Sequence, residues 1–212
     1  MPTRADQLLP FVKGSWILDV GCADHVPEPG SPYWVHGQLC KHFPNVVGID
    51  VNKENVAALK ARGFENIYVT SAETFALQRK FDTIVAGEII EHLSNPGCFF
   101  RVCGDHLVDR GRLVLTTPYP FSFLFTLYAF LKFPKTCQNP EHTCWFCPQT
   151  LKELAGRYGF QATHWELVED YRPDDTSRRY RCFVKLIYRL RWIIPKRLRC
   201  NTMLFIFQKE GR

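Results

Sequence analysis

Short, mostly apolar segments recur along the chain, separated by longer stretches in which apolar and polar residues are mixed at helical spacing. Apolar runs without strict polar alternation are typical of parallel strands that are buried on both faces. In the first 117 residues they predict five strands, at residues 16–20, 46–50, 66–69, 81–86 and 112–117.

Helix signals fill the intervals between these strands. Ser31-Pro32, Asn52 and Asn95-Pro96 are typical helix starts, and Gly63 and Gly159 are typical helix ends. The pattern predicts helices over 33–43, 53–63, 96–106 and 148–159, and two late strands at 161–168 and 202–208. Strand–helix alternation of this kind predicts a single α/β domain, with a parallel sheet and helices on both faces.

Composition and charge narrow the class of protein. With 46% hydrophobic and 23% charged residues, the 212-residue chain is globular rather than disordered. The net charge of +6 is concentrated in residues 172–199, where ten basic residues accompany two acidic ones. Nine cysteines, an odd number, and an N-terminus without an apolar core predict a cytoplasmic, reducing location. The uncharged run 113–131 contains two prolines and predicts a strand, a turn and a short apolar helix, not a membrane span.

Polar and glycine residues mark the ends of the first three predicted strands, where parallel sheets bind ligands. Gly21 and Ala23 let a ligand approach the backbone, and Asp50 can accept hydrogen bonds from ribose hydroxyls. Residues 71–73 (Ser-Ala-Glu) could hold an adenine. A third glycine is missing, which favours a ribose-containing ligand without phosphates over a nicotinamide dinucleotide. The alternative is that Gly21 only makes a tight turn and Asp50 only caps the next helix.

Five segments carry a family resemblance: WILDVGCADH, VVGIDVNKENVAALKARGF, SAETF, FDTIVAGEIIEHLSNPG and GRLVLTTPYP. In order and spacing they resemble the motifs of class I S-adenosylmethionine-dependent methyltransferases, over about residues 14–170. Within this class the chain is most similar to the ubiquinone-pathway O-methyltransferase type and to related bacterial enzymes of glycan or lipid modification. The resemblance implies one Rossmann-like domain over residues 1–212, with a mostly parallel seven-stranded sheet and an antiparallel last strand.

The resemblance also implies S-adenosylmethionine as the cofactor. The family's cofactor contacts then fall on Asp19, Gly21, Ala23, Asp50, Val51, Ala72, Glu73 and Gly87. The chain departs from the family's D-x-G-x-G pattern at Ala23, a position where alanine is often tolerated.

Glu88, Glu91 and His92 directly follow the fourth predicted strand and are the candidate catalytic residues. Methyl transfer requires alignment of the nucleophile, exclusion of water and removal of one proton. An imidazole changes charge near neutral pH, so His92 is the candidate base.

The same residues are also candidate metal ligands. In a helix, Glu88, Glu91 and His92 would share one face and could hold Mg²⁺, Mn²⁺ or Zn²⁺, with His142 as a fourth ligand. A similar arrangement occurs in metal-using members of the class, including ubiquinone-pathway and small-RNA 2′-O-methyltransferases. Alternatively, the glutamates bond to backbone amides and His92 packs near the cofactor without a metal.

A second cluster has partial zinc-like spacing. Cys137, His142, Cys144 and Cys147 are spaced C-x4-H-x-C-x2-C, and the last two cysteines have the spacing of a zinc-binding pair. Cytosolic cysteines near aromatic residues are more often core residues, which is the interpretation favoured here.

Two insertions, 119–147 and 172–200, are predicted to form the lid and the substrate-binding region. Within the second, residues 178–199 predict a basic amphipathic helix ended by Pro195, with Lys185, Arg189 and Lys196 opposite its apolar face. Such a helix suits a lid packed on the sheet or an anionic membrane surface. Nucleic acid is a rival partner, but apolar residues at helical period favour a membrane or a lid.

Together these patterns predict methyl transfer to a hydroxyl of a small, glycan-like or lipid-linked acceptor, in a cytoplasmic protein that can bind peripherally to a membrane. The alternatives are an RNA 2′-O-methyltransferase-like enzyme and a non-catalytic binding module with the same fold.

Overall fold

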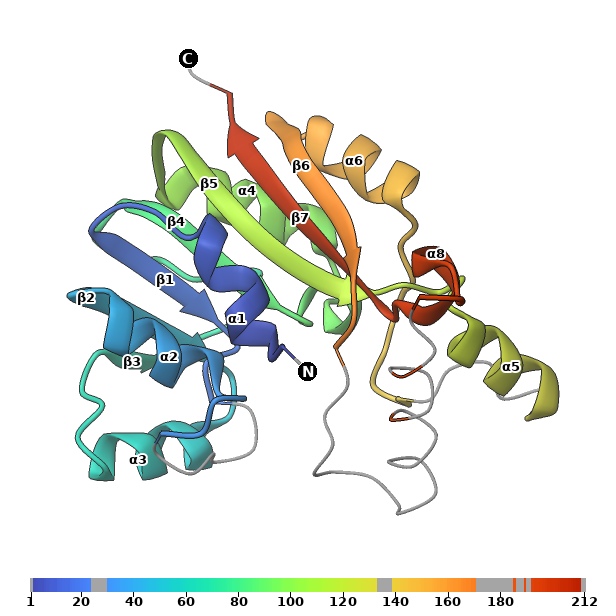
Figure 1. The fold of residues 1–212 in the computed structure, drawn as a ribbon. Coiled ribbons are helices and arrows are strands. Elements are labelled where there is room, and N and C mark those ends of the chain that lie inside the picture. The colour runs from blue at the N-terminus through green and yellow to red at the C-terminus, as the bar shows by residue number, and fades with distance from the viewer. Residues whose placement is uncertain are drawn as a thin grey trace.

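The computed structural model describes residues 2–23, 30–132, 139–170, 185, 189 and 192–210. They form a seven-stranded sheet with the strand order β3-β2-β1-β4-β5-β7-β6 (Figure 1). The strands are β1 (Trp16–Val20), β2 (Asn45–Asp50), β3 (Ile67–Val69), β4 (Phe81–Gly87), β5 (Leu107–Pro118), β6 (Phe160–Val168) and β7 (Thr202–Lys209). β1 to β5 are parallel, and β7 runs antiparallel to both β5 and β6. The predicted fold class is therefore confirmed.

The described helices are short. They are α1 (Arg4–Leu8), η1 (Leu9–Phe11), α2 (Val35–His42), α3 (Lys53–Ala61), η2 (Ile90–His92), α4 (Pro96–His106), α5 (Phe123–Leu131), α6 (Pro148–Gly156) and α8 (Lys196–Arg199). Among them, α4 and α6 cover one face of the sheet and α1 and α2 the other. The four helices predicted after the first, second, fourth and fifth strands are present as α2, α3, α4 and α6. Among the described helices, none is both long enough and apolar enough to cross a membrane.

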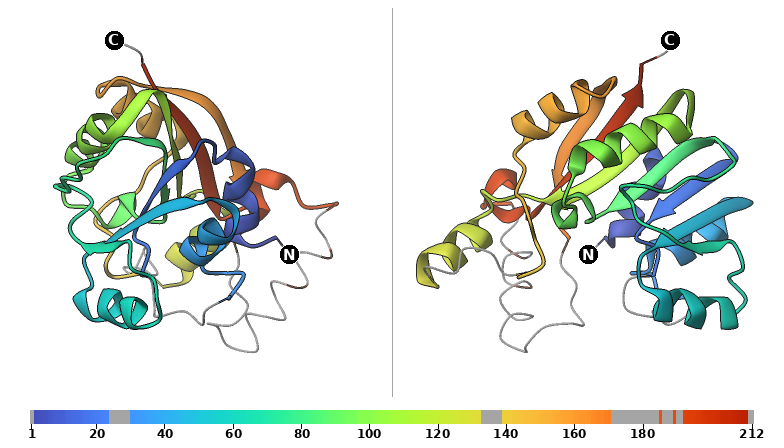
Figure 2. Two further views of the ribbon diagram at one scale, coloured as in Figure 1. Left: turned by 90° about the vertical axis from the view of Figure 1, so that its left-hand side faces the viewer. Right: turned by 180° about the vertical axis from the view of Figure 1, so that it is seen from behind.

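Successive residues of the central strands point to opposite faces of the sheet and pack into two separate hydrophobic cores. Leu18 of β1 and Ile84 of β4 pack on the face that α4 and α6 cover. Their neighbours Ile17 and Val85 pack on the opposite face, against α1 and α2. Figure 2 shows α4 and α6 together on one face of the sheet. This burial on both faces is the reason why the strands are apolar without alternation.

The chain order places a binding crevice at the carboxyl edge of the sheet. From β1 the chain crosses to β2 on one side, whereas β4 pairs with β1 on the other side. The loops that leave β1 and β4 therefore diverge, and ligands bind at such a point in doubly wound sheets.

The second predicted insertion differs from the expectation where it is described. Most of the helix expected over 178–199 lies outside the described residues. Pro195, which was expected to end it, is the N-cap residue of the separate short helix α8. Lys196 therefore belongs to α8 and not to the predicted helix, so that part of the prediction was wrong. Proline lacks a backbone N–H, and it suits the start of a helix better than its interior.

Candidate active site

The glycine loop makes a tight turn against the segment that follows β4. Gly21 has a φ of 80°, and a Cβ atom at this position would lie 2.1 Å from Ile89 Cδ1. Its N–H donates to the carbonyl of Ile49 at 2.8 Å, which holds the loop on the end of β2. Glycine is needed here for both its backbone angle and its lack of a side chain. The predicted cofactor loop and the predicted catalytic segment are therefore neighbours.

Asp50 ties this loop to the end of β2. One carboxylate oxygen accepts from the N–H of Ala23 at 2.9 Å, and the other accepts from the N–H of Asn52 at 2.9 Å. Asn52, not Asp50, caps α3, because its side chain accepts from the N–H of Asn55. The alternative role of Asp50 as a helix cap is therefore wrong. The neighbouring Val51 is exposed.

Asp19 is buried and has a partner that the sequence did not indicate. Its Oδ2 lies 3.2 Å from Nδ1 of the buried His36 of α2. Burial alone lowers the pKa of His36, but the hydrogen bonds with Asp19 and with Cys40 outweigh it and raise that pKa to about 9. His36 also fills the space beside Gly48 of β2, so the pair packs α2 against both β1 and β2.

The remaining predicted cofactor residues lie at the ends of β3 and β4. Ala72 is buried, and Glu73 accepts from the N–H of Asn95, the N-cap residue of α4. A Cβ atom on Gly87 would lie 3.3 Å from Cδ of Arg4. These contacts connect the segment after β3 to the start of α4, and the end of β4 to α1.

Glu88 does not share a helical face with Glu91 and His92. Its backbone has a φ of 58°, in the left-handed region, and its N–H donates to the carbonyl of Thr116 at 3.0 Å. The helical turn that follows, η2, begins only at Ile90. The expectation of one helical face is wrong, because the backbone at Glu88 leaves the right-handed helical region.

Glu91, His92 and His142 come together instead. One ligand atom from each lies within 4.8 Å of the others. The rings of His92 and His142 are 4.7 Å apart and nearly perpendicular. The N–H of Thr143 donates to the carbonyl of Glu91 at 2.8 Å, and this bond brings the distant His142 to η2.

The charges of this group follow from its burial. Glu91 is 1% exposed, and burial, followed by the nearby charge of Glu88, raises its pKa well above the usual range. Its Oε2 accepts from the hydroxyl of Thr117 at 2.9 Å, whereas its buried Oε1 has no hydrogen-bond partner among the described residues. Burial, followed by repulsion from His92, lowers the pKa of His142, so this imidazole is neutral at neutral pH. Glu91 and the neutral imidazole of His142 therefore lie close together, with one ligand atom of each within 4.8 Å.

The two described cysteines of the candidate zinc cluster do not group with His142. Cys137 lies outside the described residues. Cys144 lies against the backbone carbonyls of Ile90 and Glu91, and Cys147 is the N-cap residue of α6. Within the described ranges, His142 groups with Glu91 and His92 rather than with these thiols.

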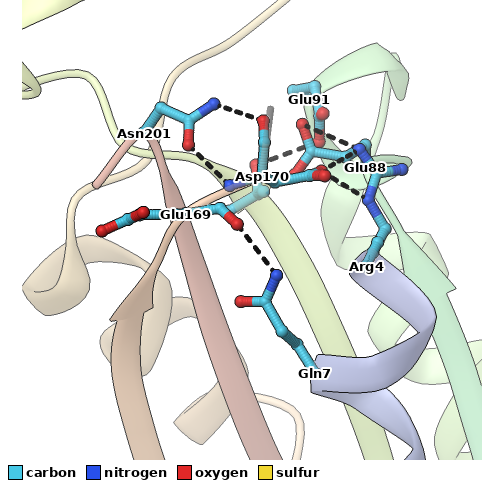
Figure 3. A network of polar contacts seen from close by, with 8 residues as sticks. Arg4, Gln7, Glu88, Glu91, Glu169, Asp170 and Asn201 are labelled. Carbon is cyan, nitrogen blue, oxygen red and sulfur yellow. Dashed lines mark hydrogen bonds and ion pairs between the residues drawn. The ribbon is translucent and has the colours of Figure 1, made fainter. Parts of the chain in front are cut away.

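Arg4 is a residue at the site that the sequence analysis missed. It reaches from α1 to the carboxyl edge of the sheet, where its Nε donates to Asp170 Oδ2 at 2.7 Å and its Nη2 lies 4.0 Å from Glu88 Oε2 (Figure 3). Asp170 in turn exchanges two backbone–side chain hydrogen bonds with Asn201. Burial lowers the pKa of Arg4, but the charges of Asp170 and Glu88 outweigh it and raise that pKa. A local signal for α1 exists, since Thr3 and Asp6 form a capping box.

Comparison with known proteins shows the family to which the chain belongs. A family model described as "Methyltransferase domain" matches residues 3–164. A ubiquinone biosynthesis O-methyltransferase of Rhodopseudomonas palustris is 28% identical over 123 residues, which cover 54% of this chain and 44% of that protein. A ubiquinone biosynthesis O-methyltransferase from a Bradyrhizobium species is 30% identical over 123 residues, which again cover 54% of this chain and 44% of that protein. The matched region thus spans less than half the length of these curated relatives.

Solved structures share the fold. A SAM-dependent methyltransferase from Archaeoglobus fulgidus superposes with a TM-score of 0.64 at 18% identity, covering 97% of this chain and 91% of that one. The N-methyltransferase NodS from Bradyrhizobium japonicum, in complex with S-adenosyl-L-homocysteine, has a TM-score of 0.58 at 16% identity, covering 97% and 85%. With the family match over most of its length, the chain belongs to the methyltransferase domain family, in the class I S-adenosylmethionine-dependent group.

Proposed function

We propose that the protein transfers the methyl group of S-adenosylmethionine to a hydroxyl of a small, glycan-like or lipid-linked acceptor. The observation that supports this most is the contact between the two halves of the site. Ile89 fills the space that a side chain on Gly21 would need, so the cofactor loop lies against the segment that carries Glu91 and His92. The O-methyltransferase relatives favour oxygen as the acceptor atom.

The proposed step needs little chemistry from the protein. The acceptor oxygen forms a bond to the methyl carbon while the carbon–sulfur bond of the sulfonium breaks, and the cofactor leaves as a neutral thioether. The hydroxyl proton passes to the imidazole of His92. Glu91 and Thr117 fix the segment that carries His92, which provides the alignment that in-line transfer requires.

The same side chains fit a divalent cation. Oε1 of Glu91 is buried without a hydrogen-bond partner among the described residues, and a neutral imidazole at His142 suits a metal ligand. Glu91, His92 and His142 would hold the ion, with Thr117 orienting the carboxylate; Glu88 lies outside this group. A bound cation would lower the pKa of an acceptor hydroxyl, and His92 would then act as a ligand instead of as the base.

Labelled-methyl transfer tests the proposal. We expect the full chain to transfer label from S-adenosylmethionine to a lipid or glycan fraction. His92→Ala should lower kcat by about 100-fold or more with little change in cofactor affinity, because proton removal belongs to the transition state. Label in RNA would favour the 2′-O-methyltransferase alternative. Cofactor binding without transfer to any fraction would favour a non-catalytic module.

A further inference from the structure

Helix α5 is apolar on all sides and yet is not buried. Its sequence, FLFTLYAFL, contains no charged residue, and none of its side chains that the structure describes is buried. Phe123 and Phe130, one heptad apart, lie on the same side of the helix and are both exposed, Phe130 by 81%. Helices that are apolar all round are normally covered. α5 instead projects from the sheet, as Figure 1 and the right-hand view of Figure 2 show.

The neighbouring segment extends this apolar surface. α5 contacts α8, and just before α8 the side chains of Trp192 and Ile193 are 85% and 79% exposed. We call the exposed apolar residues of both segments the α5–α8 surface; they are Phe121, Phe123, Phe130, Leu131, Trp192, Ile193 and Leu198. Exposed apolar side chains at this density mark an interaction surface.

The charges of these segments are all positive. Residues 119–132 and 192–200 contain no aspartate or glutamate, whereas Lys132 follows α5 and Lys196, Arg197 and Arg199 form α8. Lys132 and Arg197 are exposed. Two copies of the surface would bring like charges together, which disfavours self-association. Aromatic side chains next to exposed cations are the combination that binds an anionic lipid surface.

We propose that the α5–α8 surface binds the protein to an anionic membrane surface. The nine residues of α5 rise about 14 Å, less than half of the hydrocarbon thickness of about 30 Å, so the helix lies at the interface and does not span the bilayer. Its aromatic residues enter the headgroup region, and Lys132 and Arg197 contact lipid phosphates.

This surface is joined to the candidate active site. Phe125 of α5 contacts the ring of Trp145, whose ring lies 5.7 Å from that of His142. Four residues separate the end of β5 from the start of α5, which lies at the same sheet edge as Glu91. A membrane bound through the α5–α8 surface therefore lies beside the mouth of the site. The membrane contact itself does not depend on the proposed methyl transfer.

Vesicle sedimentation of the full chain tests the proposal. We expect binding to vesicles of equal parts phosphatidylglycerol and phosphatidylcholine, and little binding to phosphatidylcholine alone. Phe130→Ser with Leu131→Ser should lower the partition coefficient about tenfold or more, because an apolar contribution is lost. Lys132→Glu with Arg197→Glu should lower it by a similar factor and weaken its dependence on salt.

Two matched double variants control for composition. Tyr68→Ser with Val69→Ser removes an exposed apolar pair from β3, at the far edge of the sheet, and Lys41→Glu with Arg101→Glu makes the same change of net charge elsewhere. Both should bind vesicles as the unchanged protein does, and all variants should keep their affinity for S-adenosylhomocysteine. Equal binding to neutral and anionic vesicles, binding to neither, or equal losses in the controls would overturn the proposal. A dimer that Phe130→Ser with Leu131→Ser dissolves, without vesicle binding, would also overturn it and identify a second copy as the partner.

Discussion

Asp19 and His36 form a buried pair whose proton is linked to folding. The pKa of His36 is about 9 in the folded chain, against about 6.5 for an unfolded histidine. A raised folded pKa contributes stability that is fully present below pH 6.5 and is lost as pH rises through 9. The shift corresponds to about 3 kcal/mol of unfolding free energy. We expect His36→Asn, which keeps a donor to Asp19 but does not titrate, to lose this pH dependence.

Urea unfolding of both proteins across this pH range checks the prediction. The stability advantage of the natural protein over His36→Asn should shrink steadily from neutral pH toward about pH 10. If the difference between the two proteins is the same at both ends of the range, Asp19 and His36 do not share a proton in the folded state.

The group formed by Glu91, His92 and His142 gives a prediction about the effect of removing a metal ion. If Glu91, His92 and His142 hold a divalent cation, exhaustive treatment with EDTA should abolish methyl transfer, and Mg²⁺, Mn²⁺ or Zn²⁺ should restore it. His142→Ala should raise the metal concentration needed by about 10-fold or more. His164→Ala, an exposed histidine on β6, serves as the control. Full activity after chelation would leave His92 as a base that works without a cation.

Single residues also show how much of the site could be predicted from the sequence. Gly21 and Asp50 were recognisable because Gly21 directly follows β1 and Asp50 ends β2, and local sequence pattern sets both strand ends. His36 and Arg4 were not, because their partners lie 17 and 166 residues away and only the folded sheet brings them together. Glu88 was placed wrongly because a left-handed backbone angle at a non-glycine residue has no reliable sequence signal.

At the scale of elements, Arg4 and Asp170 join α1 to the end of β6. Arg4→Met would remove the cation that the carboxylate of Asp170 contacts, in a pair whose side chains are 13% and 8% exposed, which should cost about 3 kcal/mol of unfolding free energy. Asp170→Asn should also destabilise, and the double variant should lose about 1–3 kcal/mol less than the sum of the single variants.

An exposed ion pair provides the comparison for this double-mutant cycle of Arg4 and Asp170. Arg157 and Glu153 form a pair one turn apart on α6, and both are mostly exposed. Breaking it with Arg157→Met should cost less than about 1 kcal/mol. Additive losses for Arg4→Met and Asp170→Asn would show that the pair does not join the two elements energetically.

The elements themselves were largely predictable, and the exceptions have physical reasons. Long periodic segments such as α4 gave clear signals, whereas α1 has only five residues and depends on packing against the sheet. The strand predicted at 112–117 begins earlier, at Leu107, and residues 109–111 lie inside β5, where the register against β4 shifts and Arg110 has a φ of 59°. A bulge of this kind resembles a turn in sequence, although the strand continues through it.

At the scale of the whole molecule, the fold brings all these groups to one edge of the sheet. The glycine loop, the β4–η2 segment, the Arg4 network and α5 come from distant parts of the chain and meet where the parallel strands end (Figure 1). This arrangement brings the predicted cofactor loop, the candidate base and the candidate membrane contact to the same edge of the sheet.

The central claim is that this edge binds the cofactor through the Gly21 loop and Asp50, and performs chemistry through His92. Calorimetric titration with S-adenosylhomocysteine tests it most directly. We expect binding to the natural protein and to His92→Ala, with Asp50→Ala weaker by roughly 1.5–3 kcal/mol and the exposed Glu54→Ala unchanged. Absence of binding to the natural protein, or equal affinity in Asp50→Ala, would contradict the account.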